Sequence, residues 1–236
     1  DVIPTAIHIA GCIGITESLI PSLEKLKNSL SEKSEEFWDV IKTGWTHLQD
    51  ATPIRLGQEF LGYSGQIDES IKRAKNSLNE LSVLALGGTA VGTGIGMQKG
   101  FSKKVIEKLS KRFKINFTES SNHFHSQSTI DSIVSSSGSL KTIAVSLMKI
   151  GNDIRWLGSG PRAGIGEIEL PEVQPGSSIM PGKVNPVIAE SLTMACAQVI
   201  GNDQTINIAG QSGNFELNVM MPVAAYNLLQ SIDLLA

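Results

Sequence analysis

The sequence predicts an all-α protein built as a bundle of long helices. Its 236 residues are 41% hydrophobic but only 5% aromatic, a composition that suits packed helices better than an aromatic-rich β-sandwich. Apolar residues recur at steps of three and four over long stretches, which is the period of a helix with one buried face. Gly, Pro, Ser and Thr cluster between these stretches, where we expect loops, at residues 43–53, 87–100, 158–186 and 209–214.

The apolar pattern places the first long helices. The N-terminal residues DVIPTAIHIA are already helix-like, and a one-faced helix is expected between Gln66 and Leu86. A longer helix is expected to begin near Asn122 and to continue through Leu157, which gives a length of about 45–50 Å at 1.5 Å per residue. Such a rod overhangs a compact monomer with a radius of gyration of about 17–18 Å, so we expect a bundle shared between subunits.

The C-terminal segment from Phe215 onward is apolar on nearly every face. A helix with this pattern is expected to be buried all round. Pro222 lies within it and should kink the helix or mark the point at which the helix is rebuilt. Because the chain shows no internal repeat and no low-complexity linker, we expect one helical domain over residues 1–236.

Charge and composition argue against several classes of function. The net charge of −3 does not suit a nucleic-acid binder, whose phosphate contacts need a basic face. We expect no membrane span and no secretion signal, and we expect a piece of a larger protein because the chain starts inside helix-like sequence. Cys12 and Cys196 are too far apart for a disulfide framework or a metal knuckle, so both are expected in the core. A reducing compartment is therefore the default expectation.

The glycine run GGTAVGTGIG at residues 87–96 does not have the context of a nucleotide-binding loop. A dinucleotide fingerprint follows a strand, whereas here a long helix precedes the run. A P-loop ends in Gly-Lys-Ser/Thr, whereas here Met97 and Gln98 follow Gly96. We therefore expect a tight connection between helices, with a loop that shapes a substrate pocket as the alternative.

The stretch PGSSIMPGKVNP at residues 175–186 combines flexible glycines with stiff prolines. Such a loop can move and still close into one shape. Ser177 and Ser178 offer hydroxyls, Lys183 a cation, and Asn185 an amide that both donates and accepts. This set fits a carboxylate ligand, although a polar solvated loop accounts for the same composition.

Two further stretches have unusual composition. In TGWTHLQDATP, residues 43–53, Thr46 and His47 lie beside a proline-ended turn. Histidine is the usual proton shuttle near neutral pH, but a single histidine is as compatible with a structural role. The stretch GQSGNFELNV, residues 210–219, is a glycine-containing turn before the last helix and by itself indicates only a connection.

Together these three stretches resemble the three signature regions of the aspartase/fumarase superfamily, and their sequences are most similar to those of class II fumarases. The run GSSIMPGKVNP matches the superfamily signature essentially without a gap, and similar runs extend along the chain: THLQDATP, LALGGTAVGTG, SLMKIGNDIRWLGSGPRAGIGE, GNFELNV and YNLLQS. Three positions differ from the aspartate ammonia-lyase pattern. His47 stands where that pattern typically has Gln, Gly182 where it has Ala, and residues 214–216 (Asn-Phe-Glu) where it has Gln-Leu-Gln.

The resemblance implies reversible hydration of fumarate to L-malate, with no metal or organic cofactor. It also implies a homotetramer whose sites are assembled from three subunits around a small dicarboxylate. Residues 1–236 would be the central helical domain, and the N-terminal and C-terminal domains of the family would be absent from this chain. We therefore expect little or no activity from the chain alone.

By resemblance, Ser177 is the catalytic base and Ser178 binds substrate. Removing a proton next to a carboxylate builds a second negative charge on that carboxylate, which cations and oriented donors must stabilise. Lys183 and Asn185 are suited to this task. An alcohol is a poor base in water, since lowering its pKa by about six units requires about 8 kcal/mol of stabilisation. A loop that closes and excludes water could supply it.

By resemblance, His47 handles the hydroxyl side of the reaction through water, with Thr46 beside it and Glu190 orienting it. The family usually has a basic residue where this chain has Trp45. It commonly has Lys and Glu where this chain has His123 and His125; histidines two residues apart do not share a helix face, so we expect a divergent surface and no metal site. Two alternatives stay open: an aspartate ammonia-lyase-like enzyme, and a non-catalytic structural homologue such as the lens crystallins derived from this superfamily.

Overall fold

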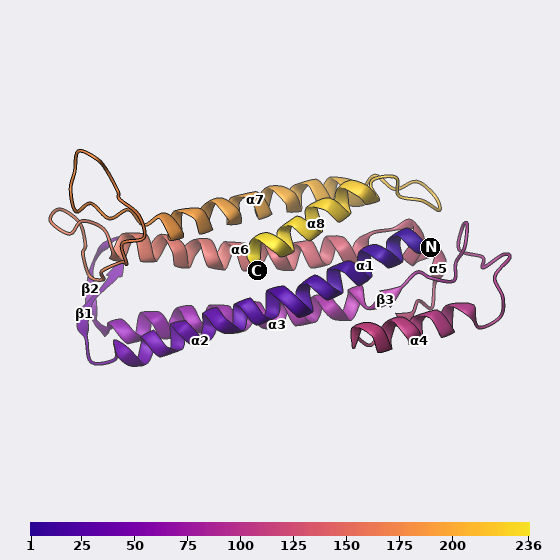
Figure 1. Cartoon of the computed structure of the whole chain (residues 1–236), viewed down its shortest axis with the longest axis horizontal. Coiled ribbons are helices and arrows are strands. Elements are labelled where there is room, and N and C mark those ends of the chain that lie inside the picture. Colours follow the sequence, from indigo (N-terminus) through magenta and orange to yellow (C-terminus); the bar gives the residue numbers. More distant parts are fainter.

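The computed structural model describes all 236 residues as an elongated bundle of long helices (Figure 1). The predicted all-α bundle is confirmed, with two very small sheets added to it. The helices are α1 (Val2–Gly14), the π-helical turn η1 (Ile15–Leu19), α2 (Ile20–Glu36), α3 (Leu56–Leu81), α4 (Phe101–Phe113), α5 (His123–Ser128), α6 (Asp131–Leu157), α7 (Val187–Gly210) and α8 (Met221–Leu235). The strands are β1 (Ile41–Thr46) with β2 (Gln49–Arg55), antiparallel, and β3 (Val83–Leu84) with β4 (Thr118–Glu119), parallel.

The first three helical segments form one continuous rod. The π turn η1 ends two residues before Pro21, whose ring and missing N–H disrupt an α-helical ladder at the preceding turn. By length and composition, the rod Val2–Glu36 could cross a membrane, and half of its most apolar window is buried inside the bundle. That burial is typical of a core helix, and Ile15, Leu19 and Leu23 are at most 1% exposed.

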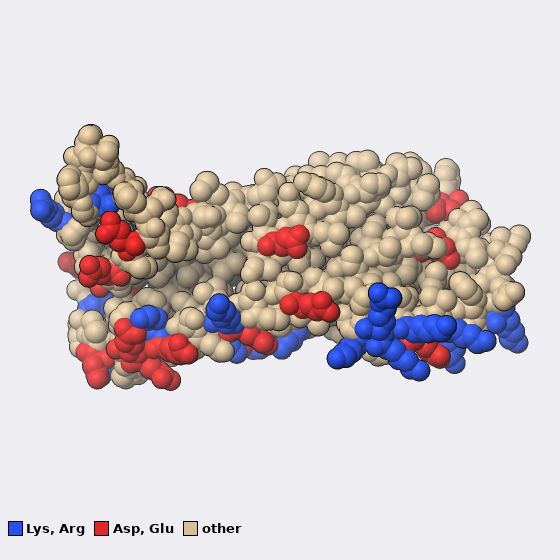
Figure 2. Space-filling model, in the orientation of Figure 1, with Lys and Arg blue, Asp and Glu red and all other residues tan.

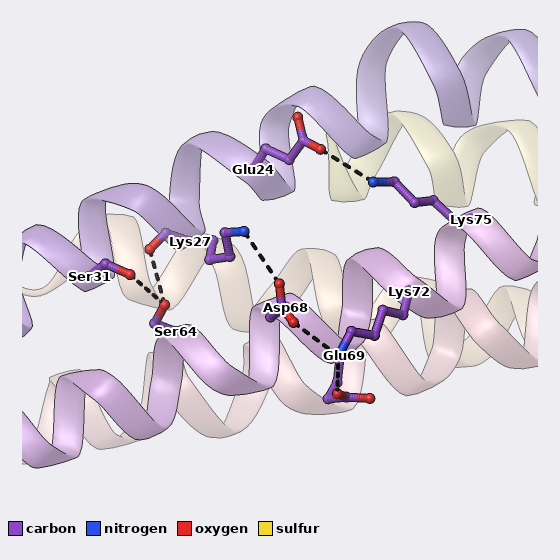
Figure 3. Close-up of polar contacts among 8 residues, drawn as sticks. All are labelled: Glu24, Lys27, Ser31, Ser64, Asp68, Glu69, Lys72 and Lys75. Atoms are coloured by element: carbon purple, nitrogen blue, oxygen red, sulfur yellow. Dashed lines mark hydrogen bonds and ion pairs between the residues drawn. The ribbon is translucent and has the colours of Figure 1, made fainter.

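Helix α3 packs beside α2, and the helix predicted for Gln66–Leu86 overlaps its C-terminal part. The predicted end was wrong, since α3 stops at Leu81 and Val83–Leu84 form the strand β3. Its core positions Ile67 and Ala74 are fully buried, as the step of three and four residues predicts. Figure 3 shows a ladder of polar contacts along the α2–α3 seam, including Lys27 Nζ to Asp68 Oδ1 at 3.3 Å. Exposed pairs of this kind contribute at most about 1 kcal/mol each, so burial of the apolar seam dominates the stability of this helix pair.

Helix α6 corrects the predicted helix from Asn122 to Leu157. It begins at Asp131 and has 27 residues, which gives about 40 Å at 1.5 Å per residue. The preceding residues form the separate helix α5, which Asn122 caps through its side chain. The hydroxyls of Ser128 and Thr129 donate to backbone carbonyls of α5. Such bonds compete with the regular ladder, which explains why the helix stops and restarts here.

Helix α8 corrects the prediction for the C-terminal segment. It begins at Met221, so Pro222 lies in its first turn, where the missing N–H costs no helical hydrogen bond. The preceding residues form a turn in which Phe215 is 93% exposed. Within α8, Ala224 and Leu228 are fully buried but Tyr226 is 65% exposed. The expectation of a helix buried on every side is therefore wrong for the single chain.

A buried polar cluster joins α6 to α7. Asp203, on α7, accepts a hydrogen bond from the Ser137 hydroxyl at 2.8 Å and lies 2.6 Å from Lys141 Nζ.

The two cysteines are free and buried, as predicted. Burial raises the pKa of the Cys12 thiol to about 12 and that of Cys196 to about 11, so both behave as core residues.

The loops gather at the two ends of the bundle. The β1–β2 hairpin and the loop 158–186 lie at one end, and the N-terminus, α4, α5 and the loop 211–220 lie at the other (Figure 1). In the same view, the surface over α7 and α8 carries few charges, while Lys, Arg, Asp and Glu gather along the opposite edge (Figure 2). Several apolar side chains of α7 are exposed, among them Ile188, Met194 and Ile208.

Candidate active site

The β1–β2 hairpin presents His47 at its tip. His47 and Leu48 form the two-residue turn, and both have left-handed backbone, with φ of 56° and 57°. Such turns favour Asn-Gly because few other residues adopt positive φ without strain. Nearby, Gly44 lies at an irregularity in the strand pairing, where a Cβ would be 2.9 Å from the carbonyl oxygen of Thr52. The hairpin thus holds an exposed imidazole on a strained backbone, a combination found at functional sites.

A buried ionic cluster fixes the base of this hairpin. Lys42, whose side chain is 7% exposed, lies 2.9 Å from Glu59 Oε1 on α3 and 2.6 Å from Glu167 Oε2 in the loop 158–186. The indole Nε1–H of Trp45 donates to Glu167 Oε1 at 2.9 Å. The hairpin is therefore tied both to α3 and to the loop 158–186, whose last part, residues 175–186, we call the signature loop. Trp45, the departure from the family pattern, holds this connection as a neutral donor.

A cavity of about 730 Å³ lies between the hairpin, α3 and α6. His47 and Trp45 line it together with Tyr63, Lys149 and Asp153. The hydroxyl of Tyr63 donates to Asp153 Oδ2 at 3.0 Å, and Lys149 pairs with the same carboxylate. Burial and the neighbouring Asp153 raise the pKa of Tyr63, so the phenol stays neutral. The volume is in the range of small-molecule pockets.

The signature loop closes on itself between Gly176 and Asn185. The side-chain amide of Asn185 donates to the carbonyl of Gly176 at 3.1 Å, and a Cβ on Gly176 would collide with the Lys183 carbonyl. Gly182 has φ of 78°, which favours glycine. The Ser177 hydroxyl accepts a hydrogen bond from the Ile179 N–H at 3.3 Å. The sequence thus forms a compact turn on which Ser178 and Lys183 are exposed.

The predicted site residues fall into two groups at the same end of the bundle. Thr46 and His47 are exposed on the hairpin, and Glu190 is half-buried in the first turn of α7. The loop holds the other group, in which Ser177 and Asn185 are half-buried and Ser178 and Lys183 are exposed.

Within one chain no hydrogen bond joins the side chains of Ser177, His47 and Glu190, and of the three only His47 lines the cavity. The third signature region, residues 210–219, lies at the other end of the bundle (Figure 1). Helix α6 separates the two ends by about 40 Å at 1.5 Å per residue. A second copy of the chain, packed antiparallel to the first, would place its residues 210–219 next to the hairpin and the loop 158–186 of the first copy.

The glycine run holds the start of the first helix. The Asp1 carboxylate accepts hydrogen bonds from the N–H groups of Gly87 and Thr89, both at 3.1 Å. The Gln127 amide donates to the carbonyls of Thr89 and Ala90 on the same loop. These loop amides, which a phosphate would need, are engaged by a carboxylate of the chain itself. Positive φ at several of its glycines explains the composition of the run.

The two unusual histidines each pair with one carboxylate. His123 Nε2 lies 3.3 Å from Glu119, and His125 Nε2 lies 3.2 Å from Asp131. Nowhere in the chain do three or more His, Cys, Asp or Glu side chains gather as a metal site would require. The positions therefore serve local pairing around α5.

The sequence interpretation missed the Lys42–Glu59–Glu167 cluster and the role of Asp1. The partners in both cases are far apart along the chain, and no local pattern connects them. The turn gave no local signal either, because His47 and Leu48 are not the Asn-Gly pair that is typical of a two-residue hairpin.

A family model described as "Lyase" matches residues 1–201. The chain belongs to this lyase family. Its place in the aspartase/fumarase superfamily, expected from the signature regions, is thereby confirmed, and so is its likeness to class II fumarases.

Relatives named "Fumarate hydratase class II" match the whole chain. It is 55% identical to that of Neisseria meningitidis over 235 residues and 52% identical to that of Helicobacter pylori over 236 residues, covering 51% of each. The solved class II fumarase of Schistosoma mansoni is 40% identical with a TM-score of 0.97, and 52% of it is covered. A "fumarate lyase:delta crystallin" from Brucella melitensis is 44% identical with a TM-score of 0.96, and 51% of it is covered. The chain thus spans about half the length of the relatives it matches.

Proposed function

We propose that this chain is the central helical domain of a class II fumarate hydratase, which adds water reversibly to fumarate and gives L-malate. The 55% identity to the Neisseria meningitidis relative, across the whole chain, carries the proposal. The flanking N-terminal and C-terminal domains would complete the protein, and the chain alone would have little activity. The proposed compartment is the cytoplasm, or the mitochondrial matrix in a eukaryote.

In this proposal Ser177 removes the proton from the carbon next to the substrate carboxylate. Its hydroxyl already accepts a backbone N–H, a contact that stabilises an alkoxide more than an alcohol. Lys183 lies exposed on the same turn and supplies the positive charge that the developing dianion needs. The side-chain amide of Asn185 makes one hydrogen bond within the loop, which fixes the shape of the turn. Its remaining polar atoms are available to the substrate. Ser178 binds the substrate.

On the hydroxyl side, His47 exchanges the proton with water, Thr46 contacts the substrate, and Glu190 from another subunit orients the imidazole. The left-handed turn supports this assignment because it projects His47 outward from a rigid hairpin. A carboxylate beside an imidazole favours the protonated form, which a group that returns a proton to a leaving hydroxyl requires. No metal or organic cofactor takes part in the proposed reaction.

The proposed assembly is a homotetramer in which the bundles lie side by side. The exposed apolar residues of α7 and the sparsely charged surface over α7 and α8 support a contact there (Figure 2). Antiparallel neighbours would place the end with His47 and Ser177 next to the end with residues 210–219. The substrate, a small dicarboxylate, would then lie between subunits.

Activity of the protein in its natural full length tests the proposal. We expect L-malate from fumarate, and a fall in kcat of at least about 100-fold in Ser177→Ala, because a positioned base contributes this much. The half-buried Ser177 makes one hydrogen bond, so the circular dichroism and the melting temperature should stay those of the unchanged protein. Fumarate hydration at unchanged kcat by Ser177→Ala would show that another group is the base.

Two other functions have distinct outcomes in the same assay. Release of ammonia from L-aspartate would identify an aspartate ammonia-lyase-like enzyme. Activity toward neither substrate, in a correctly assembled full-length protein, would identify a structural homologue; the Brucella melitensis relative shows that a crystallin name occurs in this group.

A further inference from the structure

Positive charge is concentrated in one short segment of this acidic protein. Residues 99–114 hold seven of the 20 Lys and Arg residues and only one acidic residue, Glu107, so the segment has a net charge of +6. The rest of the chain then has a net charge of −9. We name this segment's cations the α4 basic face: Lys99, Lys103, Lys104, Lys108, Lys111, Arg112 and Lys114.

None of the cations of the α4 basic face takes part in an ion pair. All seven of its side chains are exposed, and every ion pair of the molecule lies elsewhere. By contrast, most other lysines pair with a carboxylate, for example Lys72 with Asp68 and Glu69. Figure 2 shows the unpaired cations gathered over α4 at one corner of the molecule. Uncompensated charge of one sign attracts a partner of the opposite sign.

Helix α4 is oriented so that its basic side points away from the bundle. Ile106 is buried, and Val105, Leu109 and Phe113 pack against the core, while the lysines are exposed on the flanks and the outer side of the helix. A hollow of about 230 Å³ beside the helix is lined by Lys99, Lys104 and Lys108 with Phe101, Val105 and Gln98. Three ammonium groups around one hollow fit a phosphate group.

The chemistry of the face favours a lipid surface over a nucleic acid. Six of the seven cations are lysines, which act as point charges, whereas nucleic-acid recognition favours the planar fork of arginine. The face is a convex helix, and only Phe101 offers an exposed ring for base stacking. Ile95 is 73% exposed in the loop leading into α4, and Phe101 is 50% exposed at its start. Apolar side chains beside lysines suit the headgroup region of a bilayer.

We propose that the α4 basic face attaches the protein reversibly to an anionic phospholipid surface. The lysines are attracted to the headgroup phosphates, and Phe101 and Ile95 enter the boundary between headgroups and acyl chains. Within one chain, α4 lies at the end of the bundle opposite the β1–β2 hairpin and the loop 158–186 (Figure 1), and none of the residues assigned to the hydration reaction belongs to it.

Co-sedimentation with vesicles tests the proposal in the natural full-length protein. Vesicles of phosphatidylcholine alone are compared with vesicles that also contain phosphatidylglycerol. The variant K103Q/K104Q/K108Q/K111Q removes four charges of the α4 basic face. The control K25Q/K33Q/K72Q/K75Q removes four exposed charges from α2 and α3 and gives the same net charge. Circular dichroism verifies that both variants keep the fold.

We expect the unchanged protein and the control to bind only the anionic vesicles, and added salt to weaken that binding. Each lysine near an anionic surface raises the binding constant about fivefold, so the test variant should bind the anionic vesicles at least about 100-fold more weakly. Equal binding by the two variants, binding to neutral vesicles, or no binding by the unchanged protein would overturn the proposal. Binding to an RNA or DNA fragment without binding to anionic vesicles would overturn it in favour of a nucleic-acid partner.

Discussion

The strongest local strain in the candidate site lies in two residues of the hairpin tip. His47 and Leu48 both adopt left-handed backbone, which most side chains avoid. Their neighbours in sequence are ordinary strand residues, so the strain is set by the two-residue turn itself. A histidine kept in such a position is explained if its imidazole is needed at the tip.

We expect Leu48→Gly to stabilise the protein by about 0.5–1 kcal/mol, because glycine adopts the observed φ of 57° without a Cβ penalty. Leu48 is 57% exposed, so little burial is lost. Denaturant titration of both proteins measures the change. A matched control, Ile41→Gly in the adjoining strand, should destabilise the protein, since Ile41 is in a regular strand. Destabilisation by Leu48→Gly would mean that the turn is not strained.

The buried His8 predicts a pH dependence of stability. Its ring nitrogen Nδ1 lies 2.9 Å from the Val83 carbonyl oxygen, and burial lowers its pKa below the ordinary 6.5. Above pH 6.5 the ring is neutral in both states and the stability is fully present. Below it, the unfolded chain binds a proton that the folded chain does not, so stability falls as pH decreases, by up to about 1.4 kcal/mol per pH unit.

Unfolding free energies measured from pH 7 to pH 5 check this expectation. In His8→Gln the decrease over this interval should be smaller, because the titrating group is gone while a side-chain donor remains. An identical decrease in the two proteins would assign the effect to other groups.

Sequence reasoning found the residues of the signature loop because their chemistry is contiguous. Ser177, Lys183 and Asn185 lie within one short run that also contains the glycines and prolines needed for its shape. It did not find Lys42 or Glu167, since nothing near either residue indicates the other. Pairing between distant segments is set by the packing of whole helices, which a single sequence does not reveal.

At the scale of elements, periodicity placed the helices and local chemistry decided their ends. The apolar step of three and four located α3 and α6 correctly in their central parts. The start of α6 was wrong because hydroxyl side chains end α5 and separate it from α6. The hairpin was expected only as a non-helical stretch, because its turn lacks the Asn-Gly pair that signals such a connection.

The contact between α6 and α7 depends on a buried carboxylate. We expect Asp203→Ala to destabilise the protein by about 2–3 kcal/mol, because it leaves the buried Ser137 hydroxyl without an acceptor and Lys141 without its partner. Lys141 is partly exposed and reaches water, which limits the loss. Thr142→Ala is the control, since that hydroxyl bonds only within α6. Thermal and denaturant unfolding measure both, and equal stability of the two variants would contradict the assignment.

At the scale of the whole molecule, length and the position of the loops point beyond one chain. The bundle is built around rods such as Val2–Glu36, and its signature regions lie at opposite ends. The sequence predicted long helices and an incomplete site, because both follow from local patterns. It could not establish which ends would meet in the proposed assembly, since that depends on the surface through which copies of the chain would pack.

Mixing two inactive variants tests the proposed sharing of sites between subunits. Ser177→Ala and His47→Asn are produced together in the full-length protein. If a site takes Ser177 from one subunit and His47 from another, random assembly restores about a quarter of the original activity. Ser177→Ala mixed with Lys183→Ala is the control: both residues belong to one loop, so every site lacks one of them and activity stays absent. Recovery in the first mixture alone supports the shared site, whereas no recovery in either mixture places Ser177 and His47 of each site in the same chain.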